Sequence, residues 1–318
     1  MNRRTANKGI KKTKKNIKTM NNSPVNDMPK YMEGLDPESK VYKFYNEMDD
    51  ETIHAHPKRC MCIDFQDPHD FNKNTRCTAT AIKGSDFCER HQNCVSYLRN
   101  FLSGSEPDYR PELWSNPFVE GSHNCYSYFL NRQVRAVKEK CKEICLVKNK
   151  KGCPNNNSEC SDLKPQPGDY ELLKRTGSDK GKERIYRCPQ MQEKILTDNP
   201  SIYPVPFNKK CPSGYYKGAM VVDSGVGIGY KKSSTKTNDK NEGNTYHFYR
   251  QDNDATWSHK PGISPVSNVD ASGKLIYIPH FADRDYRKDS TDDDAIFYNE
   301  FCGYYCIPSN HKEHKKLA

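Results

Sequence analysis

Cys125, His247 and His259 have residue types and an order along the chain that suit nucleophilic catalysis. A cysteine attacks as its thiolate, which the free N–H groups and partial positive charge at the start of a helix stabilise. A nearby histidine can take the thiol proton, and a further polar group can fix the orientation of that ring. Cys125 stands where a helix is expected to begin, and the two histidines flank an expected tight turn in "YHFYRQDNDATWSHKPG". The pattern places Cys125 where a thiolate would be stabilised, and one of the two imidazoles could orient the other.

The third position of this triad has two rivals. Asn268 and Asp270, in "SNVDASG", are polar residues that follow His259 closely. Asp252 and Asp254 lie in the expected turn and are interpreted as turn-forming residues, because aspartate side chains bond to the turn backbone. The sequence leaves the choice of the third residue open.

A second group of residues has spacing that suits metal binding. In "RCTATAIKGSDFCERH", two cysteines enclose a glycine-containing loop, and a histidine follows the second cysteine after two residues. A turn can wrap this last pair around one ion. We predict a closed, structural zinc site with four ligands: Cys60, Cys77, Cys88 and His91. Cys62 is an alternative to Cys60 as the first ligand, and Cys94 and His69 are spare candidates.

The chain has fourteen cysteines and no apolar stretch of signal-peptide length. For such a chain the order of expectation is metal ligands, then a catalytic thiol, then disulfides. One further group is compatible with a second zinc site, with a disulfide or with free thiols: Cys141, Cys145, Cys153 and Cys160. Cys188 and Cys211 each precede a proline and are a candidate pair.

The elements that must position these residues follow an α+β pattern. The segment from Cys125 to Lys148 has good helix formers and neither proline nor glycine, so it predicts one long helix. "PQPGDYELLKR" predicts a turn and a strand, and later strands are expected in "GAMVVD", "TYHFYRQD", "ATWSHK" and "KLIYIP". With a turn centred on Asn253 and Asp254, residues 247 and 259 come close to facing each other. A helix followed by a mostly antiparallel sheet is expected.

The ordered set "NCYSYFL", "QPGDYELL" and "HFYRQD", with a polar residue across the next hairpin, resembles the NlpC-like branch of the papain-like cysteine peptidases and amidases. The resemblance covers residues 120 to 262 and implies a papain-like domain whose nucleophile-bearing helix packs on an antiparallel sheet. It also implies Cys125 as nucleophile, His247 as general base and acid, and His259 as the orienting third residue. The family's oxyanion hole would use the backbone N–H of Cys125. Two features depart from the family: "CYSY" replaces its usual Cys-Ser-Gly, and "NKKGCPNNNSECSDLK" is inserted between helix and strand.

Charge and composition divide the chain into four predicted parts. Residues 1–54 form a basic arm and linker, residues 55–95 the zinc-binding module, residues 110–308 the papain-like domain, and residues 309–318 a basic tail. The arm has eight lysines or arginines among its first twenty residues. The net charge of +10 favours an anionic partner, and we expect the arm to contact nucleic acid or a capsid. No segment approaches the ~20 apolar residues of a membrane span.

These observations predict a cysteine hydrolase, a peptidase or amidase that cleaves an amide or isopeptide bond in a peptide or protein substrate. The first alternative is a basic structural protein, stabilised by zinc, that bridges capsid or genome. The second is a thiol acyltransferase. "HFYRQDNDATWSHKPG" and "SNVDASGKLIYIP" also resemble uncharacterised proteins of giant DNA viruses and some bacteria. That resemblance implies a virion-associated protein, located in the host cytoplasm or the virion.

Overall fold

The computed structural model describes residues 59–64, 75–147, 158–168, 186–224, 244–286 and 296–310. The predicted basic arm lies outside these residues, as does the basic tail beyond Asn310.

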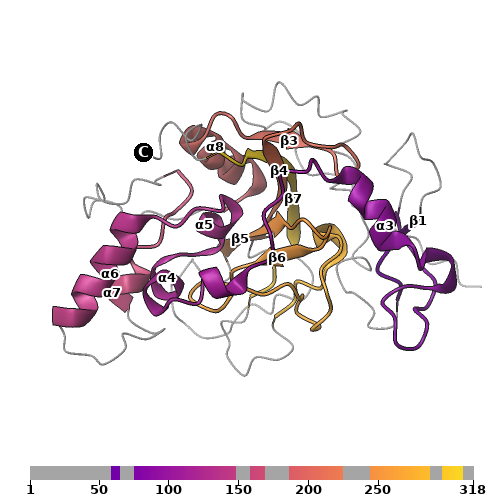
Figure 1. Cartoon of the computed structure of the whole chain (residues 1–318), viewed down its shortest axis with the longest axis horizontal. Coiled ribbons are helices and arrows are strands. Elements are labelled where there is room, and N and C mark those ends of the chain that lie inside the picture. Colours follow the sequence, from indigo (N-terminus) through magenta and orange to yellow (C-terminus); the bar gives the residue numbers. More distant parts are fainter. Residues whose placement is uncertain are drawn as a thin grey trace, which may run out of the picture.

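A five-stranded antiparallel sheet forms the centre of the molecule, in the order β3-β7-β4-β5-β6 (Figure 1). Its strands are β3 (Tyr203–Val205), β4 (Tyr215–Ser224), β5 (Asn244–Gln251), β6 (Trp257–His259) and β7 (Glu300–Pro308). The long strands contain the aromatic and β-branched residues that pack well on a pleated surface. The strands predicted in "GAMVVD", "TYHFYRQD" and "ATWSHK" are present. β7, for which no strand was predicted, lies between β3 and β4 in the sheet.

Short helices and a two-stranded ribbon surround the sheet. The ribbon pairs β1 (Ile63–Asp64) with β2 (Thr75–Arg76). The α-helices are α3 (Cys94–Leu98), α4 (Pro117–Ser122), α5 (Cys125–Phe129), α6 (Arg135–Val147), α7 (Ser158–Ser161) and α8 (Cys188–Asp198). Figure 1 places β1 and α3 at one end, α4, α6 and α7 at the other end, and the sheet between them. The fold is α+β, as predicted, and no helix in the described residues has the length and apolar character needed to cross a membrane.

Asparagine side chains begin α4 and α5. Asn116 accepts a hydrogen bond from the N–H of Phe118 at the start of α4, where a proline occupies the first helical position. Asn124 accepts a hydrogen bond from the N–H of Ser127 at the start of α5. Cys125 is therefore the first residue of a helix, as the sequence predicts.

The prediction of one helix from Cys125 to Lys148 is wrong, because the segment forms two helices. α5 ends at Phe129, and Asn131 has a left-handed conformation with φ 48°. Asparagine tolerates this conformation better than most residues, but a right-handed helix cannot continue through it. The side-chain oxygen of Asn131 accepts a hydrogen bond from Nη1 of Arg250 on β5 at 2.7 Å. A tertiary contact therefore accompanies the break, and α6 begins afresh at Arg135.

The sheet separates two hydrophobic clusters. On one face, α5 and α8 pack against β4, β5 and β7 through residues such as Phe129, Ile195 and Phe248. On the other face, the region of β1, β2 and α3 packs against Trp257, Ile276 and residues of the same strands. The predicted zinc region thus shares one continuous core with the sheet.

The β5–β6 hairpin brings the two candidate histidines together in a register that differs slightly from the prediction. His259 lies directly opposite Tyr249, so His247 is a diagonal neighbour of His259 on the same face of the hairpin. In the turn, the carboxylate of Asp254 accepts hydrogen bonds from the N–H and the hydroxyl of Thr256. This is the turn-forming role that the sequence suggests for Asp254.

Two further predicted strands have a different outcome. "KLIYIP" forms only isolated bridges at Leu275 and Ile276, and the chain then enters a 3-10 turn at Pro279–Phe281. A proline lacks the N–H that a strand would donate, so pairing ends there. "PQPGDYELLKR" is described only as far as Gly168, and its predicted strand lies outside the described residues.

Disulfides join cysteines that are far apart in the sequence. Four pairs lie within the described residues: Cys62–Cys94, Cys141–Cys160, Cys188–Cys302 and Cys211–Cys306. The suggested pairing of Cys188 with Cys211 is wrong, because both connect to β7 instead. Among the alternatives for the group that contains Cys141, the structure has the disulfide, and Cys145 is also disulfide-bonded.

Candidate functional sites

His247 and His259 form a hydrogen-bonded pair on the β5–β6 hairpin. Nε2 of His247 and Nδ1 of His259 are 2.7 Å apart, and Nε2 of His259 lies 3.0 Å from the carbonyl oxygen of Val269. A carbonyl oxygen can only accept, so Nε2 of His259 carries a proton. In the neutral ring, Nδ1 of His259 then accepts the proton of Nε2 of His247. Neutral His247 therefore has its lone pair on Nδ1, where it can act as a base.

Burial keeps both rings neutral. Burial lowers the pKa of His247 well below its ordinary value of 6.5, and the neighbouring His259 acts in the same direction. Burial also lowers the pKa of His259 to about 4. The His247 ring stacks on Tyr298 with a centroid distance of 5.1 Å and meets Tyr249 edge-on at 5.1 Å. These contacts fix the ring in one orientation.

The rivals for the third position have other partners. The carboxylate of Asp270 accepts three backbone N–H groups, two in its own loop and one from the segment that packs on it. Asn268 is bound through its backbone carbonyl to the N–H of Ile276. Of the three candidates, His259 is the residue whose hydrogen bond to His247 is observed.

Cys125 is a free and buried thiol at the start of α5. Burial raises the pKa of Cys125 to about 12, although the backbone N–H of Phe248 and the charges of Lys260 and Lys164 act in the opposite direction. The backbone N–H of Tyr126 in α5 also acts to lower this pKa, and burial is the larger effect. α5 has five residues, and desolvation outweighs the effect of so short a helix. At rest Cys125 is a thiol.

The thiol and the imidazole come from opposite faces of β5. Cys125 belongs to the cluster on the α5 side, with its sulfur near the backbone N–H of Phe248, the residue that follows His247. Side chains alternate along a strand, so Phe248 points toward α5 and His247 toward the face that carries Tyr298. Tyr298 also interacts electrostatically with Cys125. No hydrogen bond joins the side chains of Cys125 and His247 among the described residues.

The "PQPG" segment supports the start of α5. Nδ2 of Asn124 donates to the carbonyl of the first proline in this segment at 2.8 Å. The hydroxyl of Tyr126 donates to the carboxylate of Asp198 at 2.7 Å, and the N–H of Gly168 donates to the same carboxylate at 2.7 Å. The segment on which the family resemblance partly rests therefore lies against both neighbours of Cys125.

Lys260, which no sequence pattern singles out, joins the elements that carry the site. It directly follows His259 and is fully buried. Its Nζ donates to the carbonyl oxygens of Glu120, Gly262 and Ser264 at 2.9, 2.8 and 3.2 Å. Burial lowers the pKa of Lys260 to about 8. Its bond to Glu120 holds α4, which directly precedes α5, against the end of β6.

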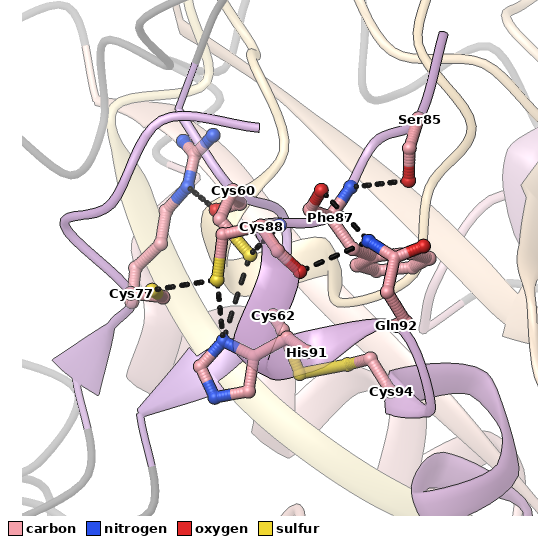
Figure 2. The surroundings of a disulfide bond; sticks show 10 residues. Cys60, Cys62, Cys77, Ser85, Phe87, Cys88, His91, Gln92 and Cys94 are labelled. Atoms are coloured by element: carbon pink, nitrogen blue, oxygen red, sulfur yellow. Dashed lines mark hydrogen bonds between the residues drawn. A yellow bond between two sulfur atoms is a disulfide. The ribbon is translucent and has the colours of Figure 1, made fainter. Parts of the chain in front are cut away.

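Cys60, Cys77, Cys88 and His91 gather at one point beside β1 and β2 (Figure 2). Their ligand atoms all lie within 4.8 Å of one another. The sulfurs of Cys77 and Cys88 are 3.8 Å apart, and Nδ1 of His91 lies 3.6 Å from the sulfur of Cys60 and 3.4 Å from that of Cys88. These are the four residues predicted from spacing, and together they could hold one metal ion.

A disulfide decides between Cys60 and Cys62 as the first ligand. Cys62 is bonded to Cys94, and Figure 2 shows this bond beside the four-residue group. Cys94 is thereby removed from the spare candidates, and His69 lies outside the described residues. Cys60 is the cysteine whose sulfur points to the ring of His91.

Charge requirements favour a cation among these thiols. Burial raises the pKa of Cys77 to about 11 and also raises the pKa of Cys60. A metal ion binds the thiolate form and supplies the positive charge that makes adjacent thiolates stable. The histidine of the group has a pKa lowered by burial, so its ring is neutral and can bind a metal.

Arg76 ties this group to the rest of the molecule. Its side chain is fully buried. Nε donates to the carbonyl oxygen of Cys60 at 3.1 Å and Nη1 to that of Phe281 at 3.4 Å. The hydroxyl of Tyr277 donates to the carboxylate of Asp86 at 3.1 Å. The four-residue group is therefore fastened to the segment that covers the sheet.

Comparison with known proteins finds a short local similarity. A stretch of 42 residues, 13% of this chain, is 52% identical to "Insoluble matrix shell protein 1" of Ruditapes philippinarum. The stretch spans 28% of that protein's length. No family model and no solved structure matches the chain. The chain thus shares one segment with the shell protein, and a similarity of this extent assigns no family.

Proposed function

We propose that the protein is a cysteine hydrolase, a peptidase or amidase of papain-like design, in which Cys125 attacks an amide or isopeptide bond. The observation that supports this most is the hydrogen-bonded chain from Val269 through His259 to His247. This chain leaves the lone pair of Nδ1 of His247 available, and the free thiol of Cys125, at the start of α5, lies near the backbone N–H of the next residue, Phe248. Catalytic hydrogen bonds are often long in free enzymes and shorten when substrate binds.

In the proposed reaction, Nδ1 of His247 takes the proton of Cys125 while the sulfur attacks the carbonyl carbon. The S–C bond forms, and the π electrons of the carbonyl group move to its oxygen. Protonated His247, held by His259, then gives the proton to the leaving nitrogen as the C–N bond breaks. Water attacks the resulting thioester and passes a proton to His247, which returns it to the sulfur. An acyltransferase would use the same residues with a different acceptor in place of water.

An electrophilic thiol probe tests this proposal. We expect the folded protein to be labelled at Cys125 faster than the denatured protein, because His247 assists loss of the proton. Cys125→Ala should abolish labelling with almost no change in melting temperature, and His247→Gln should slow it ~10²-fold or more. Asn268→Ala, at a rival position, is the matched control and should label normally. Labelling of the folded protein no faster than that of the denatured protein would remove the basis for a hydrolase.

We also propose that Cys60, Cys77, Cys88 and His91 hold a structural zinc ion. With Zn–S near 2.3 Å and Zn–N near 2.0–2.1 Å, tetrahedral ligands are separated by about 3.8 Å for two sulfurs and about 3.6 Å for sulfur and nitrogen. The observed separations of 3.8 Å between sulfurs and of 3.6 and 3.4 Å between sulfur and nitrogen agree with these values. Four protein ligands fill the tetrahedron, so the ion would stabilise the fold rather than bind substrate.

A non-enzymatic structural role is the second candidate. The disulfides between distant elements favour it, and so does the segment shared with a protein whose name describes an insoluble shell matrix. The thiol-probe experiment separates the two candidates, because a purely structural protein requires no activated cysteine.

The disulfides also bear on location. Disulfides persist in oxidising surroundings and are rare in the reducing cytosol. We therefore infer that, of the two locations expected from the sequence, the virion or another oxidising environment suits the chain better than the host cytoplasm. The expected contact of the basic arm with nucleic acid or a capsid stays a prediction.

A further inference from the structure

Tyr298 lies two residues before β7, and backbone hydrogen bonds of Tyr298 and of the preceding residue fix it. Its own N–H donates to the carbonyl oxygen of Arg284 at 3.2 Å. The N–H of the preceding residue, Phe297, donates to the carboxylate of Asp223 on β4 at 3.1 Å. The Tyr298 ring stacks on His247 with an angle of 24° between the ring planes. The tyrosine is therefore held in one place against the candidate base.

The hydroxyl of Tyr298 has no hydrogen-bond partner in the part of the chain that the structure describes. The residue is 8% exposed, and its hydroxyl oxygen is not fully enclosed by the protein. The hydroxyl also lies within electrostatic reach of Cys125. An unused donor near both the thiol and the base is suited to receive a group of the substrate.

We propose that the hydroxyl of Tyr298 donates a hydrogen bond to the oxyanion that forms when Cys125 attacks a carbonyl carbon. This inference rests on the proposed hydrolase function and names a donor that the sequence does not supply. The backbone N–H of Cys125 is the other donor that the family resemblance implies.

The chemistry of the phenol suits this role. Burial, together with the nearby thiol, raises the pKa of Tyr298 well above its ordinary value of 10.0, so the phenol stays a protonated donor. As the S–C bond forms, the carbonyl oxygen gains negative charge and the thiol proton passes to His247. The phenol keeps its own proton and contributes only a hydrogen bond. This bond strengthens as charge develops, so it lowers the barrier more than it tightens substrate binding.

Two reactions at the same sulfur test the proposal with the full-length protein. Acylation by p-nitrophenyl acetate passes through an oxyanion and releases p-nitrophenolate, whereas alkylation by iodoacetamide displaces iodide without forming an oxyanion. Tyr298→Phe removes one oxygen and keeps the stacked ring. We expect the Cys125-dependent burst of p-nitrophenolate to slow ~10²–10³-fold. Alkylation and the melting temperature should stay as in the unmodified protein.

The matched control is Tyr249→Phe. Tyr249 also contacts the ring of His247, and its hydroxyl has no hydrogen-bond partner among the described residues, but its electrostatic neighbours are Tyr286, Arg284, Tyr298 and Asp270 and do not include Cys125. Neither reaction should change in this variant. The proposal is overturned if Tyr298→Phe is acylated at the normal rate, or if its alkylation slows in parallel, which would assign Tyr298 to positioning His247. If the unmodified protein shows no burst that depends on Cys125, the proposed hydrolase function falls and this inference falls with it.

Discussion

Burial of the Cys125 thiol and of the His247 imidazole favours the neutral form of each group. Removing either charge from water costs free energy, which is why the pKa of Cys125 is raised and the pKa of His247 is lowered. In the proposed reaction the proton therefore moves as the sulfur attacks, and not beforehand. The residue types predicted the participants, but burial sets their protonation states, and burial is a property of the fold.

The first prediction concerns the dependence of activity on pH. Protonated His247 cannot accept the thiol proton, so kcat/KM should stay constant as the pH drops through the ordinary histidine pKa of 6.5 and fall only as it approaches the lowered pKa of His247. From about pH 7 to about pH 9 it should stay constant, because the histidine is already neutral and the thiol has a pKa of about 12. A fall in kcat/KM that is centred at pH 6.5 or above would contradict a buried histidine as the base.

At the scale of elements, α5 reaches the sheet because β4 has a glycine beneath it. A Cβ atom at Gly218 would overlap the side chains of Phe129 and Ile307. The ring of Phe129 in turn packs on Phe248 of β5 with a centroid distance of 4.6 Å. The close approach of helix and sheet thus places Cys125 against the backbone of β5.

The second prediction tests this approach with Gly218→Ala. The added methyl group should push α5 away from β4, lower the free energy of unfolding by ~1–3 kcal/mol and slow thiol labelling of Cys125. Urea denaturation and probe kinetics measure the two effects. Gly121→Ala is the matched control, because the nearest atom to its new Cβ is Cβ of Cys160 at 3.9 Å. If Gly218→Ala and Gly121→Ala have the same free energy of unfolding and the same labelling rate, the close packing at Gly218 does not position Cys125.

At the scale of the whole molecule, the four-residue metal group is part of the main fold. Its cysteines belong to the same hydrophobic cluster as Trp257 and Tyr304 of the sheet. Arg76 adds hydrogen bonds between the group and the segment at Phe281. Loss of a metal ion should therefore affect the sheet and not only β1, β2 and α3.

The third prediction follows for metal removal. The purified protein should contain one zinc ion per chain by elemental analysis. Cys88→Ser should lose it and lower the melting temperature by at least ~5 °C, with a single unfolding transition. Cys94→Ser removes the neighbouring disulfide but no ligand, so it should keep the zinc. Two separate transitions in the zinc-free variant would contradict the shared core.

The fourth prediction concerns acid stability. Burial lowers the pKa values of His123 and His259 to about 4 in the folded protein, whereas the unfolded chain titrates near 6.5. Between these pH values the unfolded state binds more protons, so stability falls as pH drops, by about 3 kcal/mol for each residue. Urea denaturation at pH 7 and pH 4 measures the loss. In His123→Gln the decrease in the free energy of unfolding between pH 7 and pH 4 should be about 3 kcal/mol smaller. An unchanged decrease would show that His123 does not contribute to the acid sensitivity.

Short-range patterns in the sequence determined both candidate sites. The ligands Cys77, Cys88 and His91 lie within fifteen residues, and the pair His247 and His259 lies within one hairpin. At such separations, turn geometry and strand pairing bring side chains together without help from the rest of the fold, so residue types and spacing were sufficient. The position of Cys125 at a helix start was equally local, since the capping asparagine is its neighbour.

Only the tertiary structure decided which distant residues meet. The bonds from Cys188 and Cys211 to β7 span 114 and 95 residues, and no spacing rule fixes such partners. The break after α5, the buried acceptors of Lys260 and the place of Tyr298 on His247 have the same origin. Each depends on packing between elements that meet only when the whole core forms. Hydrophobic burial has no direction, so the sequence contains no periodic signal that identifies a specific distant partner.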